Sequence, residues 1–182
     1  TDQGAEPISV SVNAASSQFR DGRLLEDIKR ALAATGLNPH RLTIELTESM
    51  LMGNSREALE ALSALKALGV GLSLDDFGTG FSSLAYLKRM PLDELKVDRS
   101  FVTGIPADSD SGAIVSAVIA LAHSMGLQVT AEGVETPEQL EFLKQRGCDE
   151  YQGYLCAKPM PSSDFLEFML LRGTTVYSPE QD

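Results

Sequence analysis

Apolar residues recur along the chain with two periods, and the two periods alternate. Short apolar or alternating runs typical of strands are 8–12, 42–46, the start of 72–80, 94–97, 127–131 and 150–152. Helical spacing of apolar residues follows each run and predicts helices over 21–34, 55–68, 81–89, 111–125, 137–146 and 164–171. Such alternation indicates parallel strands joined by right-handed crossovers, which is an α/β fold.

The limits of several helices carry capping signals. Thr136, Pro137 and Gln139 have the spacing of an N-cap, a first-turn proline and a capping-box partner. Asn54 and Glu57 repeat the cap and its partner before an apolar helical stripe. Between residues 98 and 111 the sequence instead predicts a polar loop.

Every predicted strand ends in a polar or ionisable residue. These residues are Asn13, Glu45, Asp75, Lys96, Glu132 and Gln152. In a β/α barrel the carboxyl ends of all strands meet on one face, whereas an open doubly wound sheet concentrates its site at one crevice. Six contributing strands favour a TIM-type (β/α) barrel over residues 1–172, followed by a tail at 173–182. A closed barrel of this type has eight strand–helix units. The sequence predicts six strands, so we expect about six of the eight units here.

Two adjacent acids stand where the third strand meets a glycine-rich turn, in the sequence LSLDDFGTG. Partly desolvated carboxylates repel each other, so Asp75 beside Asp76 is costly for folding. The plain alternative is an N-cap for the next helix, but a cap needs only one acid. A divalent-cation site accounts for both.

Composition limits the possible partners. A net charge of −11 and a pI near 4.6 argue against a basic groove for a nucleic-acid polymer. An acidic protein binds a phosphate ester when a metal ion supplies positive charge. No apolar stretch is long enough to span a bilayer and no signal peptide is visible, so we expect a cytoplasmic domain, whose parent protein could be anchored in a membrane. Cys148 and Cys156 lack metal-type spacing and are predicted to be reduced and buried.

The motifs together resemble the EAL family of bacterial cyclic-di-GMP phosphodiesterases. The matching stretches are SVNAASSQF (11–19), ELTES (45–49), DDFGTGFSSL (75–84), LKVDRSFV (95–102), AEGVET (131–136) and QGYLCAKPMP (152–161). The family fold is also a β/α barrel. The Glu-Ala-Leu strand that names the family, with its metal-binding Glu and substrate-binding Arg, is expected upstream of residue 1. Ala15 stands where the family usually carries Ser.

The resemblance implies a site with two divalent ions, Mg²⁺ or Mn²⁺, that opens one phosphodiester bond of cyclic-di-GMP to give pGpG. Asn13, Glu45 and Asp75 would hold one ion, and Asp75 would bridge to a second ion completed by Asp76 and Glu132. Two such ions stabilise the attacking and departing oxygens. Lys96 and Gln152 would act with Glu132 in catalysis. Supporting and substrate-loop residues would be Glu48, Phe77, Gly78, Thr79, Gly80, Asp98, Glu135 and Pro159.

Several of these residues also have simpler structural explanations. Lys96 could be an exposed lysine at a strand end, Glu135 a first-turn acid favoured by the helix dipole, and Glu48 a solvated loop acid. A different class of function is a non-catalytic module that binds cyclic-di-GMP or a protein through the same barrel. We expect a homodimer, sensor or GGDEF-type domains in the parent chain, and poor catalysis by the 182 residues alone.

Overall fold

The computed structural model describes residues 8–51, 55–78 and 84–172. Several predicted features fall outside these ranges: the Asn54 cap, Thr79 and Gly80, the first residues of the helix expected over 81–89, and the tail 173–182. All six predicted strands lie inside them.

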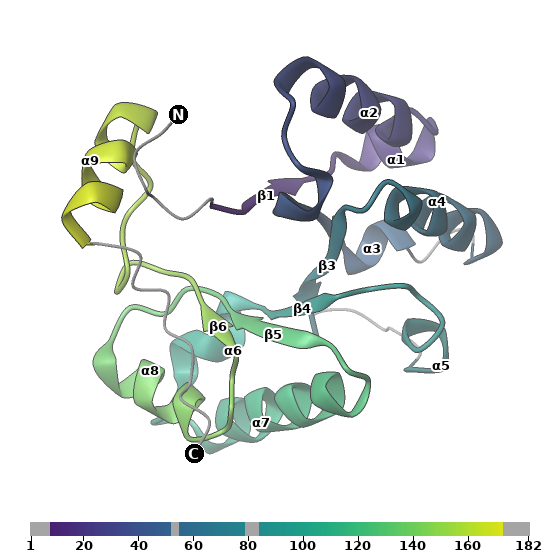
Figure 1. The fold of residues 1–182 in the computed structure, drawn as a ribbon. Coiled ribbons are helices and arrows are strands. Elements are labelled where there is room, and N and C mark those ends of the chain that lie inside the picture. The colour runs from purple at the N-terminus through teal and green to yellow at the C-terminus, as the bar shows by residue number, and fades with distance from the viewer. Residues whose placement is uncertain (1–7, 52–54, 79–83, 173–182) are drawn as a thin grey trace.

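One curved, parallel sheet forms the centre of the molecule. Its strands are β1 (Val10–Asn13), β2 (Leu42–Thr47), β3 (Gly71–Phe77), β4 (Glu94–Val97), β5 (Gln128–Ala131) and β6 (Glu150–Tyr151). The order in space is the order in sequence, and every neighbouring pair is parallel. The α/β prediction with about six strand–helix units is therefore confirmed, and the sheet follows part of a barrel wall (Figure 1).

Helices connect the strands and cover the outer side of the sheet, except α9, which follows β6 and stands apart from the other helices (Figure 1). Their bounds are α1 (Ser16–Arg20), α2 (Leu24–Thr35), η1 (Pro39–Arg41), α3 (Glu48–Leu51), α4 (Ser55–Ala67), α5 (Leu84–Leu87), α6 (Arg99–Gly104), α7 (Ser109–Ser124), α8 (Pro137–Lys144) and α9 (Ser162–Arg172). The long predicted helices are present with small shifts at their ends. The short helices α1 and α3 are new, since they are too short to show a periodic pattern.

The predicted polar loop between residues 98 and 111 is wrong, because α6 occupies its first part. Asp98 caps this helix by accepting a hydrogen bond from the amide of Ser100. Val102 is fully buried and anchors the helix to the core. One buried residue in six gives no helical stripe, so the sequence pattern alone did not show the helix.

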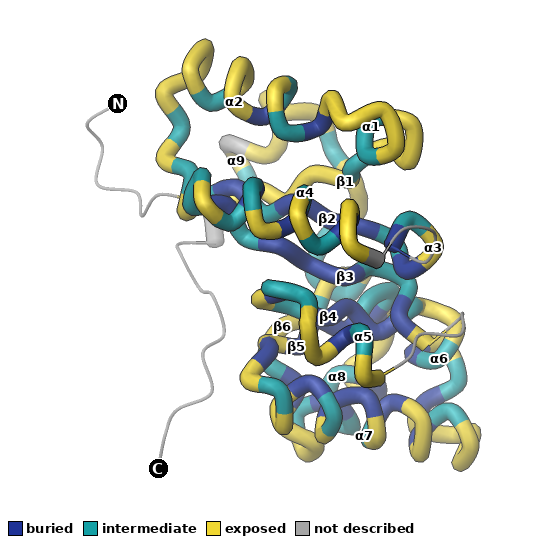
Figure 2. Tube along the Cα trace, turned by 90° about the vertical axis from the view of Figure 1, so that its right-hand side faces the viewer, coloured by how far each residue is buried: buried dark blue, intermediate teal, exposed yellow. Residues whose placement is uncertain are grey.

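The core lies between the sheet and its helices. Figure 2 shows burial running along β2, β3 and β4 and along the facing sides of α4 and α7. Strand β1 is different, because its four residues are all exposed. Its outer edge and that of β6 have no strand partner within the described ranges.

The two cysteines are free. Cys148 is buried as predicted, and burial, with Asp149 nearby, raises the pKa of its thiol to about 12. Cys156 is only half-buried, so that part of the prediction is wrong. Among the helices described, none is long and apolar enough to cross a membrane.

Candidate metal centre

Parallel pairing brings the polar strand ends to one edge of the sheet. Asn13 pairs in register with Glu45, and Glu45 pairs with Ser73, two residues before Asp75. Residues two apart on a strand share a face. Asn13, Glu45 and Asp75 therefore lie on the same face, as the strand-end pattern predicted, and Asn13 is exposed there.

A distortion in β3 changes the expectation for the paired acids. The strand does not break at Asp75 but continues to Phe77, and its register with β4 shifts between Leu74 and Phe77. Asp76 sits within this shift at φ 57°, a left-handed conformation that a non-glycine residue seldom adopts. On a regular strand Asp75 and Asp76 would face opposite sides. With this distortion, carboxylate oxygens of both residues lie within 4.8 Å of each other, and bulges re-aim side chains in this way.

Lys96 is the buried centre of this cluster. Its Nζ lies 2.5 Å from Glu132 Oε1, 3.1 Å from Glu45 Oε1 and 3.6 Å from Asp75 Oδ1. Only 4% of the lysine side chain is exposed, so the reading of Lys96 as a solvated strand-end lysine is wrong. Asp76 is a fourth acid whose charge interacts with Lys96, so the acids of the cluster outnumber its one ammonium group.

The acids in the cluster fit a divalent cation. Carboxylate oxygens of Asp75, Asp76 and Glu132 all lie within 4.8 Å of one another. Such hard oxygen donors suit Mg²⁺, Mn²⁺ or Ca²⁺ rather than zinc. This is the triad that the resemblance implied for one of the two ions. Glu45 and Asp75, which the resemblance implied for the other, are joined through Lys96.

The charges of the cluster shift the pKa values of its members. Burial alone would lower the pKa of Lys96, but the hydrogen bond and charge of Glu132, with the charges of Asp75 and Glu45, outweigh burial and raise it. Burial raises the pKa of Glu132, and Asp75 and Glu45 add to this against the opposing effect of Lys96. Burial, then Asp75 and Asp98, raise the pKa of Asp76. The acids are thus under-compensated in the absence of a cation.

Gln152 extends the cluster toward the last strand. Its side-chain amide donates to Glu132 Oε1 at 2.8 Å, the same oxygen that Lys96 contacts. The backbone supports this contact, because Val134 N donates to Gln152 O. Two donors, Lys96 in β4 and Gln152 directly after β6, therefore hold the same oxygen of the Glu132 carboxylate.

The supporting residues take varied positions. Phe77 is buried in β3, Asp98 caps α6, and Pro159 is exposed. Gly78 has φ 99° and stands against the Phe101 ring, where an added Cβ would lie 3.0 Å from the ring. Thr79 and Gly80 lie outside the described residues.

The positions of Glu48 and Glu135 also differ from the simpler interpretations of these residues, a solvated loop acid and a first-turn acid. Glu48 is not a solvated loop acid: it opens α3, is 5% exposed, and neither carboxylate oxygen has a hydrogen-bond partner within the described residues. Glu135 precedes the cap of α8 and pairs with Arg99 at 2.7 Å. Arg99 and the bridging role of Gln139 were not foreseen, although Arg99 lies inside the LKVDRSFV motif.

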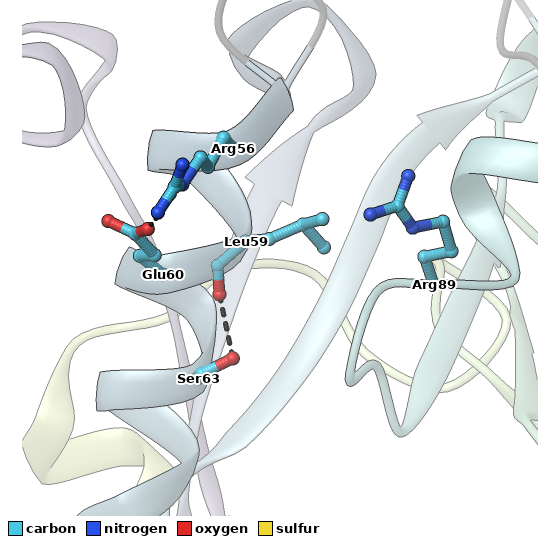
Figure 3. Close-up of a pocket in the computed structure, with 5 residues that line it drawn as sticks. All are labelled: Arg56, Leu59, Glu60, Ser63 and Arg89. Atoms are coloured by element: carbon cyan, nitrogen blue, oxygen red, sulfur yellow. Dashed lines mark hydrogen bonds and ion pairs between the residues drawn. The ribbon is translucent and has the colours of Figure 1, made fainter.

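A separate hollow of about 430 Å³ is lined by residues of α4 and by Arg89, which follows α5. Figure 3 shows its lining, which is Arg56, Leu59, Glu60, Ser63 and Arg89. Arg56 is bound to Glu60, and the Ser63 hydroxyl to the carbonyl of Leu59. None of these five is one of the strand-end residues of the cluster.

Comparison with known proteins gives one consistent result. The sequence profile of the EAL domain matches residues 1–159. Two curated relatives from Pseudomonas aeruginosa are a bifunctional diguanylate cyclase/cyclic di-GMP phosphodiesterase, MucR, and a cyclic di-GMP phosphodiesterase, NbdA. They are 46% and 47% identical to this chain over 91% of its length. The chain spans 24% of MucR and 21% of NbdA.

Solved structures that resemble this chain include proteins with cyclic-di-GMP bound. The MucR phosphodiesterase in complex with c-di-GMP has a TM-score of 0.83 and 46% identity, covering 86% of this chain and 64% of that one. BlrP1 from Klebsiella pneumoniae, in a complex with manganese and c-di-GMP, has a TM-score of 0.73 and 33% identity, covering 83% of this chain and 39% of that one.

Proposed function

The chain belongs to the EAL domain family, and we propose that its strand-end cluster is the catalytic centre of a phosphodiesterase that hydrolyses cyclic-di-GMP to pGpG. The observation that carries this proposal is the buried Lys96 ringed by carboxylates from three other strand ends. The names of MucR and NbdA, and the c-di-GMP bound to the MucR structure, support the substrate.

The proposed cofactors are divalent cations, Mg²⁺ or Mn²⁺. Asp75, Asp76 and Glu132 would hold one ion, and Asn13, Glu45 and Asp75 would hold another. Their oxygen donors and excess negative charge support this assignment, as does the manganese in the BlrP1 complex. Such ions supply Lewis-acid stabilisation of the charge that develops on the phosphodiester oxygens.

Lys96 would stabilise the negative charge that grows on the phosphate or on the attacking water. Its pKa is raised, so the ammonium group stays charged over the whole physiological range. A buried, fixed cation costs no reorganisation when charge develops, which is why such groups favour the transition state over the ground state.

Glu132 and Gln152 would orient the attacking water. Gln152 donates to one oxygen of Glu132, which leaves the second oxygen for a cation or a water proton. Hydrolysis adds this water across one phosphorus–oxygen bond, so that one guanosine regains its 3′-hydroxyl and the other keeps a 5′-phosphate.

The protein would act within a larger assembly. The chain covers only about a quarter or less of MucR and NbdA, so we propose that sensor or GGDEF-type domains accompany it. The exposed edge of β1 carries Val10 and Val12, and such an edge favours pairing, including with a second copy of the chain.

The test is hydrolysis of cyclic-di-GMP by the full-length protein, followed by chromatography of the products. We expect pGpG to form with Mg²⁺ or Mn²⁺ and not with a chelator. Asp75→Asn should abolish most activity, and the control Glu26→Gln on the surface of α2 should retain it. Binding of cyclic-di-GMP without hydrolysis under all these conditions would favour the non-catalytic module.

A further inference from the structure

Two ion pairs join the same two strand–helix junctions. Lys96 and Arg99 lie at the junction of β4 and α6, and Glu132 and Glu135 follow β5. Lys96 contacts Glu132, and Arg99 Nη2 lies 2.7 Å from Glu135 Oε1. Both pairs have the same separation in sequence, 36 positions. The inner pair is buried, and the outer pair is 59% and 41% exposed.

Arg99 also contacts the backbone between the two acids. Gly133 has φ 68°, and an added Cβ would lie 2.3 Å from Arg99 Cγ and 2.8 Å from its Cδ. The absence of a side chain thus allows the arginine stem to lie directly on Gly133 while its guanidinium reaches Glu135. Arg99 covers the segment that carries Glu132.

The same segment is held on its other sides. Gly153 packs so closely on Val134 that an added Cβ would lie 2.2 Å from the Val134 carbonyl oxygen. Gln139 accepts hydrogen bonds from the amides of Glu135 and Thr136. Among these three contacts with residues 133–136, that of Arg99 is the charged one. Arg99 lies at the same strand–helix junction as Lys96.

Binding of a cation at Glu132 changes the strength of the ion pair between Lys96 and Glu132. A cation bound to the Glu132 carboxylate neutralises part of its charge and repels the nearby Lys96 ammonium group, so the inner pair weakens when the site is loaded. The outer pair has no carboxylate in the triad of Asp75, Asp76 and Glu132 and does not compete.

We propose that Arg99 is a positioning residue, whose pair with Glu135 keeps Glu132 beside Asp75 and Asp76 when a bound cation weakens the pair of Glu132 with Lys96. The inference rests on the proposed cation site. An ordinary exposed ion pair contributes little to global stability, so a purely structural role and a positioning role have different consequences.

The experiment measures three quantities in Arg99→Ala, Arg99→Lys, Glu135→Gln and the double variant Arg99→Ala/Glu135→Gln. They are the Mn²⁺ affinity by calorimetry, amide hydrogen exchange over residues 132–136 without metal, and the urea midpoint of unfolding. The matched control is Arg56→Ala, which breaks another exposed arginine–glutamate pair, the one with Glu60.

We expect Arg99→Ala to weaken Mn²⁺ binding about tenfold, the lower end of the effect seen for residues that orient metal ligands. Exchange over 132–136 should accelerate, and the urea midpoint should stay close to that of Arg56→Ala. Arg99→Lys should restore part of the affinity, because it keeps the charge and the stem. The double variant should be no worse than either single variant, since both break one interaction.

Unchanged Mn²⁺ affinity and unchanged exchange in Arg99→Ala would overturn the proposal. A fall in affinity matched by an equal fall in global stability, with no rescue by lysine, would also overturn it. Failure of the wild-type protein to bind Mn²⁺ would instead sink the proposed cation site. In that case the exchange measurement still decides whether Arg99 holds the segment.

Discussion

Lys96 shows how burial changes the meaning of a residue. In the sequence it is one of 15 basic residues, following an apolar position in a short strand. In the structure it is an enclosed ammonium group within reach of three carboxylates. Removing one partner from a buried charge cluster leaves the remaining charges uncompensated, so substitutions here should affect both chemistry and stability.

Lys96→Ala in the full-length protein should lower kcat for cyclic-di-GMP by about 10² or more, the range found when one donor to a developing charge is lost. The KM should change far less, because the interaction is made mainly in the transition state. Steady-state kinetics decides this, with Lys29→Ala on α2 as the control. A raised KM at unchanged kcat would show instead that Lys96 contributes uniform binding.

Asp76 should make the metal-free protein pH-dependent. Its pKa is raised by burial first and then by Asp75 and Asp98. A carboxyl whose native pKa is raised stabilises the fold when protonated, and this contribution is lost as the pH rises through that value. At neutral pH without metal, its charged form therefore costs stability.

Asp76→Asn should accordingly unfold at higher urea than the wild type at neutral pH in chelator, and the difference should shrink as the pH falls through the raised pKa of Asp76. Asparagine tolerates the left-handed conformation of this position, so backbone strain is matched. In Mn²⁺ the order should reverse, because the variant loses a ligand. A wild type more stable than the variant in chelator at neutral pH would contradict the assigned charge state.

Helices and strands with a clear periodicity of apolar residues were predictable from the sequence, and the short or irregular ones were not. Strand β4 was predicted to the residue, and the cap of α8 has the expected partners, Thr136 and Gln139. Helix α6 was missed because it buries a single residue, Val102. The distortion in β3 was not predicted either, because the residue with positive φ is Asp76 and not a glycine, so the sequence carries no glycine signal at that position.

Gln139 connects α8 with α6 and with the residues that precede α8, so its substitution should lower the stability of the fold. It is 7% exposed, accepts from the amides of Glu135 and Thr136, and donates to the carbonyl of Val102 in α6. Gln139→Leu keeps the volume but leaves the amides of Glu135 and Thr136 without this acceptor and removes one of two donors to the Val102 carbonyl, the other being Ile105 N. This should lower the free energy of unfolding by about 1–3 kcal/mol.

Urea unfolding checks this value, with Gln145→Leu as the control at the exposed end of the same helix. That control should change stability by less than about 0.5 kcal/mol. Equal effects of the two substitutions would show that the bridge to Val102 is not a stabilising contact.

At the scale of the molecule, the alternation of strands and helices predicted both the parallel sheet and the edge where the site lies. This worked because parallel strands must all present their carboxyl ends at one edge, whatever their side chains. Which strand ends touch one another depends on sheet curvature and register. The sequence therefore named Glu45, Asp75, Lys96 and Glu132 but not their distances, and it gave no sign of the Arg99–Glu135 pair.

The central claim is that these converging strand ends bind divalent cations, and calorimetric titration of Mn²⁺ tests it most directly. The wild-type protein should bind Mn²⁺, and Asp75→Asn should weaken binding by about 10-fold or more, because this carboxylate belongs to both proposed ion sites. Glu26→Gln, which removes the same charge from the surface of α2, should bind like the wild type. Equal Mn²⁺ affinity of Asp75→Asn and the wild type would contradict the account.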